Sequence, residues 1–436
     1  MIVSPAFAGK RYAVLGLARS GLATVLSLVA SGAEVTAWDS DEAKRAVAPT
    51  GVTLGDPMEI ELAGFDGIVV SPGVPLNTHP IAARAKAAGV PVIGDIELFA
   101  QGRGSLPEHK VVAITGTNGK STTTALIHHI LQTAGVPTTL GGNIGLPILG
   151  QEPLPTGGVY VLELSSFQID LTFTLDADVA VLTNITPDHL DRYDGFEAYA
   201  ASKWRLFEMQ SRDHVALVDW NVVMAGLAPD PHTSGRGTYF GINPMERGMQ
   251  AQWPALQGPH NAENAAAAYQ ACSWLGIDPN LIEQGLRTYP GLPHRMQRVA
   301  EIDGVLYVND SKATNATSTA PALGAYPRIH WILGGRRKTD DLDACKPFYG
   351  HVVSAWTIGE AAELFEKILL ESGIHARNVG TLDRAVKQAA QIARPGEVVL
   401  LSPACASYDQ FRDYEARGDA FRAAVAMLGS TMGGGA

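Results

Sequence analysis

The chain has 436 residues, of which 46% are hydrophobic, and its formal net charge is −11. At about 150 residues per domain, this length predicts roughly three domains with sizeable cores. The acidic balance and the lack of a long Lys or Arg run argue against a nucleic-acid partner, and no apolar stretch approaches the ~18 residues of a membrane span. No signal peptide is evident. Three cysteines without CxxC spacing favour a reducing cytoplasm and no structural zinc.

The first hundred residues alternate between apolar strands and helices. Strands are predicted at residues 12–15, 34–38 and 67–70, and a helix is predicted at residues 22–30. This alternation predicts a parallel sheet with ligands at the carboxyl ends of its strands. Residues 16–21 form an imperfect GxGxxG turn, since Ala18 replaces the middle glycine, and Asp39 takes the place of a ribose-binding acid. The turn alone does not distinguish three roles: a plain strand–helix connection, an NAD site, or a site for the diphosphate of another nucleotide.

The most informative segment is residues 114–122, Ile-Thr-Gly-Thr-Asn-Gly-Lys-Ser-Thr. A predicted strand at 111–114 precedes it and a predicted helix at 125–131 follows. Its glycines let backbone N–H groups surround phosphate oxygens at a helix N-terminus, and its Lys and Ser suit phosphate and Mg²⁺. The common P-loop has Gly where Ile114 stands, so this compact form is more specific than a generic nucleotide loop.

Polar side chains follow the next two predicted strands, residues 159–162 and 179–182. Glu163 comes directly after the first strand, and a carboxylate beside a phosphate loop is a natural ligand for a hard cation. The second strand leads into residues 184–191, Asn-Ile-Thr-Pro-Asp-His-Leu-Asp. Taken alone, His189 is more often a loop or capping residue than a ligand.

The helices further along carry polar residues whose role their spacing leaves open. Lys203 falls in a helix predicted over 196–208, where an isolated Lys is ordinarily a solvated charge. Asn261 and Asn264 open an alanine-rich helix. They either cap that helix or recognise the edge of a nucleotide base.

The last third contains predicted strands at 306–309, 329–333 and 398–401, after a segment at 291–295 that looks like an interdomain linker. Polar clusters follow these strands: Asp-Ser-Lys-Ala-Thr-Asn at 310–315, Gly-Gly-Arg-Arg-Lys at 334–338 and Ser-Pro-Ala-Cys-Ala-Ser at 402–407. Such clusters lie where an open α/β sheet presents its ligand crevice. Cys405 has no nearby His and is predicted to be a packed residue, not a nucleophile.

Together these segments resemble the Mur ligases along essentially the whole chain and in the family's order. The motifs that carry the resemblance are residues 115–121, 163–168, 184–191, 260–264, 294–295, 309–315 and 401–407. The motifs at 309–315 and 401–407 are similar to those of the members that add D-glutamate. The resemblance implies three α/β domains: a Rossmann-like UDP-sugar-binding domain (1–100), a P-loop-type ATPase domain with a parallel sheet (101–296) and a Rossmann-like domain that binds the amino acid (297–436).

The activity that the resemblance implies is ATP-dependent addition of D-glutamate to UDP-N-acetylmuramoyl-L-alanine, through an acyl phosphate, with ADP and phosphate as products. This is a cytoplasmic step of peptidoglycan precursor synthesis and so of cell-wall biogenesis, cell shape and division. The resemblance further implies two Mg²⁺ ions, which Mn²⁺ can replace, and CO₂ bound as a carbamate on Lys203. We expect a monomer that binds small molecules and neither nucleic acid nor a membrane. We also expect ATP between the second and third domains, with the third closing on binding.

The family's site residues carry over by position. The catalytic residues would be Lys120, Glu163, His189 and Lys203. The metal ligands would be Ser121, Glu163, His189 and carbamylated Lys203. ATP would bind to Gly116, Thr117, Asn118, Gly119, Lys120, Ser121, Thr122, Asn261, Asn264, Arg295 and Asp310. The UDP-sugar would bind to Arg19, Ser20, Asp39, Ser71, Gly73, Asn143, Ser165, Gln168 and His189. D-Glutamate would bind to Lys312, Thr314, Lys338, Ser407 and Tyr414, where Tyr414 replaces a more usual Phe.

Two other functions stay open at this stage. One is a sibling amide ligase with another amino acid or a folate-type acceptor. The other is a nucleotide-binding, regulatory or NAD-dependent protein that keeps the phosphate loop without ligase turnover. The complete set of Lys120, Glu163, His189 and Lys203 argues against the second.

Overall fold

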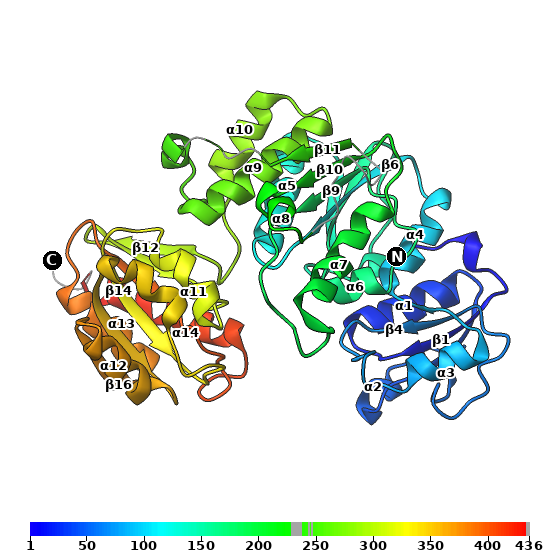
Figure 1. Cartoon of the computed structure of the whole chain (residues 1–436), viewed down its shortest axis with the longest axis horizontal. Helices are drawn as coiled ribbons and strands as arrows, with labels where there is room; N and C mark the ends of the chain where they lie inside the picture. Colours follow the sequence, from blue (N-terminus) through cyan, green and yellow to red (C-terminus); the bar gives the residue numbers. More distant parts are fainter. Residues whose placement is uncertain (228–237, 243–244, 246, 433–436) are drawn as a thin grey trace. The chain divides into compact units, whose positions relative to one another are not determined.

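The computed structural model describes residues 1–227, 238–242, 245 and 247–432, and it contains three β-sheets (Figure 1). The strands of the first two sheets are all parallel, and the third sheet is mixed. The predicted three-domain α/β class is therefore confirmed. None of the described helices is long and apolar enough to cross a membrane.

The N-terminal sheet has the strand order β3-β2-β1-β4-β5. Its strands are β1 (Arg11–Leu15), β2 (Glu34–Trp38), β3 (Thr53–Leu54), β4 (Gly67–Val70) and β5 (Val92–Ile93), and its helices are α1 (Arg19–Ala30), α2 (Glu42–Ala46), α3 (Ile81–Ala88) and α4 (Asp95–Gly102). All four residues of β4 are buried. Burial on both faces is why β4 is an uninterrupted apolar run.

The central sheet has the order β11-β10-β9-β6-β8-β7. Its strands are β6 (His109–Thr115), β7 (Thr138–Gly142), β8 (Gly158–Glu163), β9 (Val179–Leu182), β10 (Val215–Val218) and β11 (Thr238–Gly241). The helices of this part are α5 (Lys120–Thr133), α6 (Ser166–Asp170), α7 (Gly195–Glu208), α8 (Trp220–Met224), α9 (Pro259–Trp274) and α10 (Pro279–Thr288). The predicted phosphate loop, at 116–119, joins the carboxyl end of β6, near the middle of the sheet, to α5.

The C-terminal sheet has the order β12-β13-β17-β14-β15-β16. Its strands are β12 (Gln297–Ile302), β13 (Val305–Asn309), β14 (Ile329–Gly334), β15 (Val352–Ile358), β16 (Ala376–Gly380) and β17 (Val398–Leu401), with helices α11 (Ala316–Leu323), α12 (Ala362–Glu371), α13 (Leu382–Ile392) and α14 (Tyr414–Met432). β12 is antiparallel to β13. Asp303 and Gly304 between them both have positive φ, 50° and 75°, which is the requirement of a two-residue hairpin turn.

The chain divides into two compact units: 1–244 with 264–286, and 245–263 with 287–436. Within the first unit, the N-terminal and central sheets are joined by backbone hydrogen bonds. The Ile2 amide donates to the Leu149 carbonyl over 3.0 Å, and the Gly94 amide donates to the Leu171 carbonyl over 2.9 Å. Glu97, which is 2% exposed, accepts from the backbone amides of residues 173 and 174. The first two sheets therefore pack as one body.

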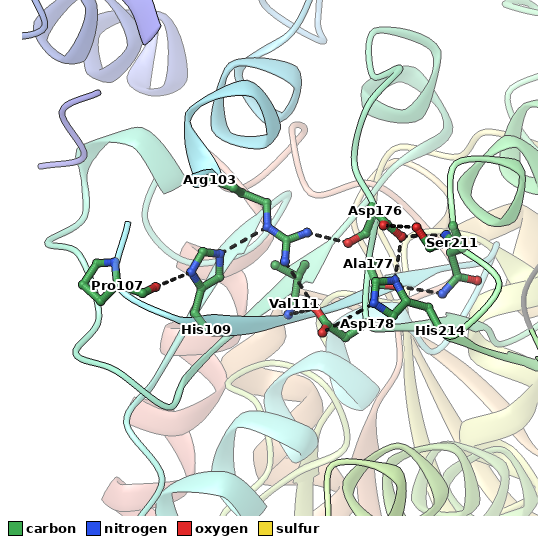
Figure 2. A network of polar contacts seen from close by, with 10 residues as sticks. Arg103, Pro107, His109, Val111, Asp176, Ala177, Asp178, Ser211 and His214 are labelled. Atoms are coloured by element: carbon green, nitrogen blue, oxygen red, sulfur yellow. Dashed lines mark hydrogen bonds and ion pairs between the residues drawn. The ribbon is translucent and has the colours of Figure 1, made fainter. Parts of the chain in front are cut away.

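A polar network ties the connection between these sheets to the base of the central sheet (Figure 2). Arg103 donates to the Asp176 carbonyl and pairs with the Asp178 carboxylate at 3.3 Å. The His214 ring contacts Asp176 at 2.6 Å. Burial raises the pKa of Asp176, but hydrogen bonds from Ser211 and His214 hold it below its usual value. Because the network lies at the amino ends of the strands, it holds the fold at the edge opposite the phosphate loop.

Candidate active site

The phosphate loop adopts a conformation that only glycine tolerates at two positions. Gly116 has φ 145° and Gly119 has φ 83°. A Cβ on Gly116 would lie 2.0 Å from Thr183 Oγ1, and a Cβ on Gly119 would lie 2.3 Å from Asn264 Oδ1. Lys120 Nζ folds back and donates to the carbonyls of Gly116, over 2.9 Å, and Thr117, over 2.7 Å. The loop therefore holds its lysine over its own backbone, where a phosphate would meet it.

Neighbouring strands hold this loop in shape. The Asn118 amide donates to Asn184 Oδ1 over 2.8 Å, and Asn184 Nδ2 donates back to the Asn118 carbonyl over 3.1 Å. Thr117 Oγ1 and the Tyr199 hydroxyl are 3.1 Å apart. Ser121 is buried at the start of α5, and Thr122 follows it on the same helix. These contacts connect the predicted nucleotide loop to the loop after β9 and to α7.

Glu163, at the end of β8, is the residue best suited to hold a metal ion. It is 2% exposed, and its Oε1 accepts from Asn143 Nδ2 over 3.0 Å. Its Oε2 is buried and has no hydrogen-bond partner among the described residues. An unpaired buried carboxylate oxygen is costly unless a cation or donor satisfies it. The residues present thus fit a divalent cation with oxygen ligands.

Lys203 is buried in α7, at 2% exposure, and its Nζ lies 4.6 Å from the centroid of the Tyr199 ring. Burial and the nearby Lys120 charge lower the pKa of Lys203 well below its usual value, against the pull of Asp188, Asp170 and Glu163. A lowered pKa makes the uncharged amine, which is the form that reacts with CO₂, more accessible than in an ordinary lysine. The environment suits the predicted carbamate.

His189 lies on the loop after β9 with φ 52°. Its ring packs edge-on against Phe167, with centroids 5.1 Å apart, and its Nε2 is 3.6 Å from Asp188 Oδ2. Its side chain is 52% exposed. Among the described residues, no three His, Cys, Asp or Glu side chains are grouped closely enough to hold a metal by themselves, so a metal here needs the Ser121 hydroxyl, a carbamate or ligand oxygens as well.

The predicted UDP residues lie at the carboxyl edge of the N-terminal sheet. Asp39 accepts from the Leu17 amide over 2.8 Å, and Ser71 Oγ donates to the Gly16 carbonyl over 3.2 Å. Burial raises the pKa of Asp39, but the backbone amides of Asp41 and Leu17, together with Lys44, hold it below its usual value. The two side chains therefore shape the turn at 16–21.

The other predicted UDP-sugar residues lie around this edge. Ser20 is on α1 and Gly73 follows β4. Arg19 Nη2 donates to the Gly145 carbonyl over 2.9 Å, which connects the N-terminal sheet to the loop that contains Asn143. Ser165 and Gln168 form a capping box at the start of α6. Their side chains therefore cap α6, in addition to any contact with a ligand.

The two candidate base-binding amides lie on α9. Asn264 Oδ1 accepts from Thr123 Oγ1 over 3.2 Å, so it is next to the phosphate loop. Asn261 is buried and donates from Nδ2 to the Gln257 carbonyl over 3.0 Å. Because α9 begins at Pro259, both residues lie inside the helix and neither is its N-cap; recognition of a nucleotide base stays a prediction.

The second unit brings together the other predicted ATP and amino-acid residues. Asp310 accepts from Ser402 Oγ over 2.8 Å and from the Met296 amide over 3.2 Å. Its burial raises its pKa to about 7, although these donors and the charge of Arg295 lower it. Lys312 Nζ lies 3.9 Å from the centroid of the Tyr414 ring. The tyrosine therefore keeps the aromatic face that a Phe would supply.

The remaining predicted glutamate residues differ in burial. Ser407 is 2% exposed, after β17. Thr314 is half-buried and Lys338 is exposed. Cys405 is buried, as expected, and burial raises its pKa to about 12, so the thiol is not poised as a nucleophile.

Arg417 on α14 was not identified from the sequence. Its guanidinium is 1% exposed and donates to the Ser311 carbonyl over 2.8 Å and the Ala406 carbonyl over 3.3 Å. Burial lowers its pKa to about 10, where it remains charged. A third hydrogen bond, over 3.5 Å, runs to the Gly334 carbonyl, so Arg417 joins all three segments that contain the predicted amino-acid ligands. Since Ser311, which accepts one of these hydrogen bonds, is more than 100 residues away in the sequence, no local spacing of residues could reveal the role of Arg417.

Three family descriptions match successive parts of the chain. They are the Mur ligase MurD-like N-terminal domain at residues 10–94, the Mur ligase middle domain at 114–226 and the Mur ligase glutamate ligase domain at 294–405. Among the similar proteins, one from Novosphingobium aromaticivorans is 61% identical over 98% of this chain and 97% of its own length. One from Zymomonas mobilis is 55% identical over 98% and 100%. Both are named UDP-N-acetylmuramoylalanine--D-glutamate ligase.

Solved structures show the same fold at low sequence identity. UDP-N-acetylmuramate-alanine ligase MurC from Thermotoga maritima aligns with a TM-score of 0.58 at 17% identity, covering 97% of this chain and 99% of its own. MurF ligase from Thermotoga maritima, solved with ADP, aligns with a TM-score of 0.55 at 16% identity, covering 97% and 96%.

Proposed function

Since the chain belongs to the Mur ligase family, we propose that it is the ligase that adds D-glutamate to UDP-N-acetylmuramoyl-L-alanine, with conversion of ATP to ADP and phosphate. The observation that carries the proposal is its identity of 55 to 61%, over nearly the whole length, to proteins named for this reaction. The loop at 116–119 between β6 and α5, and Glu163 at the end of β8, support the proposal.

In the proposed first step, a carboxylate oxygen of the L-alanine end attacks the γ-phosphorus of ATP, and ADP leaves. This forms an acyl phosphate. Phosphoryl transfer depends mainly on positioning and charge neutralisation. The amides of residues 116–122 and the Lys120 ammonium would hold the β- and γ-phosphates, and Asn261, Asn264, Arg295 and Asp310 would hold the rest of the nucleotide.

Ser121, Glu163, His189 and carbamylated Lys203 would hold two Mg²⁺ ions, or Mn²⁺ in their place. When bound, the ions would reduce the repulsion between the attacking carboxylate and the phosphate. Two observations support this assignment: Glu163 Oε2 has no hydrogen-bond partner in the described part of the chain, and the pKa of Lys203 is lowered.

In the proposed second step, the neutral amine of D-glutamate attacks the acyl carbon, and phosphate leaves from the tetrahedral intermediate. An amide bond forms as the C–O bond to phosphate breaks. The two glutamate carboxylates would meet Lys312, Thr314, Ser407 and Lys338, with Tyr414 beside Lys312. Arg417 would keep the surrounding loops in place and add a buried positive charge.

The proposal includes the setting of the reaction. We place it in the cytoplasm, on a monomer, as a step of peptidoglycan precursor synthesis. The domain boundaries 1–100, 101–296 and 297–436 are part of it, because each range contains one complete sheet.

Phosphate release from ATP tests the function. The protein is incubated with Mg²⁺, UDP-N-acetylmuramoyl-L-alanine and, separately, D-Glu, L-Glu, D-Asp, L-Ala or a diamino acid. We expect turnover with D-Glu alone. Turnover only with another amino acid would make the protein a sibling ligase, and no turnover with any acceptor would refute the ligase assignment. A Lys120→Met variant supplies the background rate.

A further inference from the structure

Arg192 joins two loops that belong to different sheets of the first unit. Its guanidinium donates to the Gly73 carbonyl over 3.1 Å and to the Val74 carbonyl over 3.4 Å. Both carbonyls lie on the segment after β4, where Gly73 is a predicted UDP-sugar contact. Arg192 itself follows β9, three residues after His189, and its backbone amide donates to the His189 carbonyl over 2.9 Å. One side chain therefore connects the proposed sugar-nucleotide loop to the proposed metal loop.

Phe167 makes this connection continuous with the His189 ring. The Arg192 guanidinium lies 4.7 Å from the centroid of the Phe167 ring. The His189 ring packs on the same phenylalanine at 5.1 Å. Because the His189 side chain is 52% exposed, its contacts with Phe167 and, at 3.6 Å from Nε2, with Asp188 Oδ2 help to fix the orientation of its ring.

The surrounding interface is too open to fix the two loops by packing alone. A cavity of about 90 Å³ lies between them, lined by Pro72 and Leu76 on one side and by Asp170 and Tyr193 on the other. One further hydrogen bond crosses it, from Asn77 Nδ2 to the Asp191 carbonyl over 3.0 Å. Because this pocket is partly open to solvent, parts of the two loops do not pack against each other there, and the directional contacts help to set the position of one loop against the other.

From this arrangement we infer that Arg192 is a positioning residue for the ligase reaction. It fixes the loop that contains Gly73 against the loop that contains His189, so that a sugar nucleotide held on the first loop presents its carboxylate end to the second. Arg192 acts through His189 and through the backbone of residues 73–74, without contacting the reacting atoms. This inference rests on the proposed function.

The geometry explains why an arginine is needed at this position. A guanidinium can donate to two carbonyls while its flat face stacks on a ring, whereas an ammonium is a point charge that cannot do both. Arg192→Lys is therefore expected to restore little of what Arg192→Ala loses. A displacement of about 1 Å at the reacting atoms can reduce the rate about 10²-fold, and we expect kcat to fall by 10- to 100-fold in both variants.

The test compares Arg192→Ala with Arg84→Ala in the full-length protein. Arg84 on α3 also donates to two backbone carbonyls, those of Pro57 and Ile60, but it has no proposed role in the site. We expect Arg192→Ala to lower kcat and to raise the KM for UDP-N-acetylmuramoyl-L-alanine about tenfold, with the KM for ATP within about twofold of the wild-type value. Arg84→Ala is expected to leave all three constants unchanged.

A double-mutant cycle with His189→Ala separates positioning from general destabilisation. If Arg192 acts through His189, the Arg192→Ala/His189→Ala variant has about the same kcat as His189→Ala alone, because coupled residues are not additive. Additive losses, or an Arg192→Ala effect on the KM for ATP equal to that for the sugar nucleotide, would overturn the inference. Wild-type turnover with D-glutamate tests the proposed function separately. If the wild type is inactive, calorimetric titration of both proteins with the sugar nucleotide decides, and equal affinities overturn the inference.

Discussion

Replacing Lys203 by methionine should stabilise the protein while it abolishes turnover. Methionine has nearly the length and shape of the lysine chain, so the packing of α7 is retained. The lysine Nζ is buried beside the Tyr199 ring, and among the described residues no carboxylate forms an ion pair with it. The variant removes a buried amine whose burial destabilises the folded protein and which the proposed reaction needs.

The size of this effect depends on pH in a defined direction. Burial, with the Lys120 charge, lowers the pKa of Lys203 well below 10.5 in the folded protein. Between the two pKa values the unfolded state binds the proton and the folded state does not, so wild-type stability rises with pH. The advantage of Lys203→Met over the wild type should therefore grow by up to about 1.4 kcal/mol for each pH unit below 10.5, until the folded amine is also protonated.

Urea unfolding at pH 8, 9 and 10 in CO₂-free buffer measures this advantage. Lys367→Met is the matched control, because Lys367 is on the exposed face of α12 with a side chain 73% exposed. Its stability difference should be flat across the same range. A flat difference for Lys203→Met as well, or full turnover of that variant, would refute the reasoning. In Lys203→Ala, formate or acetate should restore part of the activity, since either places a carboxylate where the carbamate would lie.

Three further changes test other parts of the site. Gly116→Ala should destabilise the protein by about 1 to 3 kcal/mol and weaken ATP binding, since its Cβ would lie 2.0 Å from Thr183 Oγ1. Denaturation and nucleotide titration measure the two effects. The control is Gly135→Ala, because Gly135 also has a positive φ but has open space around it. Because the pKa of Asp310 is raised from 3.8 to about 7 in the folded protein, the folded state binds a proton more tightly than the unfolded state, and wild-type stability should fall as the pH rises between these values. Asp310→Asn should abolish this fall, and an unchanged pH-dependence of its melting temperature would contradict the assignment. Arg417→Met should raise the KM for D-glutamate about tenfold, a loss of about 1.4 kcal/mol, and an unchanged KM would show that the buried guanidinium does not order that pocket.

Strands with a run of buried apolar residues could be predicted from the sequence; β4, β9 and β17 are buried throughout, and β2 is buried on one face. Residues 34–38, 67–70, 179–182 and 398–401 were predicted with the bounds that β2, β4, β9 and β17 have. Shorter strands such as β3, with two exposed residues, leave no such apolar run. The antiparallel edge of the third sheet was missed, although Asp303-Gly304 is a recognisable hairpin signal.

Some residues of the candidate site could be predicted from the sequence, and others could not. Residues that follow a strand directly, such as Glu163, could be identified because the end of a parallel strand is both a sequence position and a place in space. Arg192 and Arg417 could not, because each acts on backbone carbonyls about 100 residues away. Such contacts depend on tertiary packing, which residue spacing does not encode.

Oxygen transfer from the acceptor carboxylate tests the central claim most directly. UDP-N-acetylmuramoyl-L-alanine labelled with ¹⁸O in its carboxylate is converted with ATP, Mg²⁺ and D-glutamate, and the released phosphate is analysed by mass. If the carboxylate is activated as an acyl phosphate, one labelled oxygen moves into phosphate for each amide bond formed. Phosphate that is released without label, or that forms without D-glutamate-dependent product, would contradict the proposed ligase reaction.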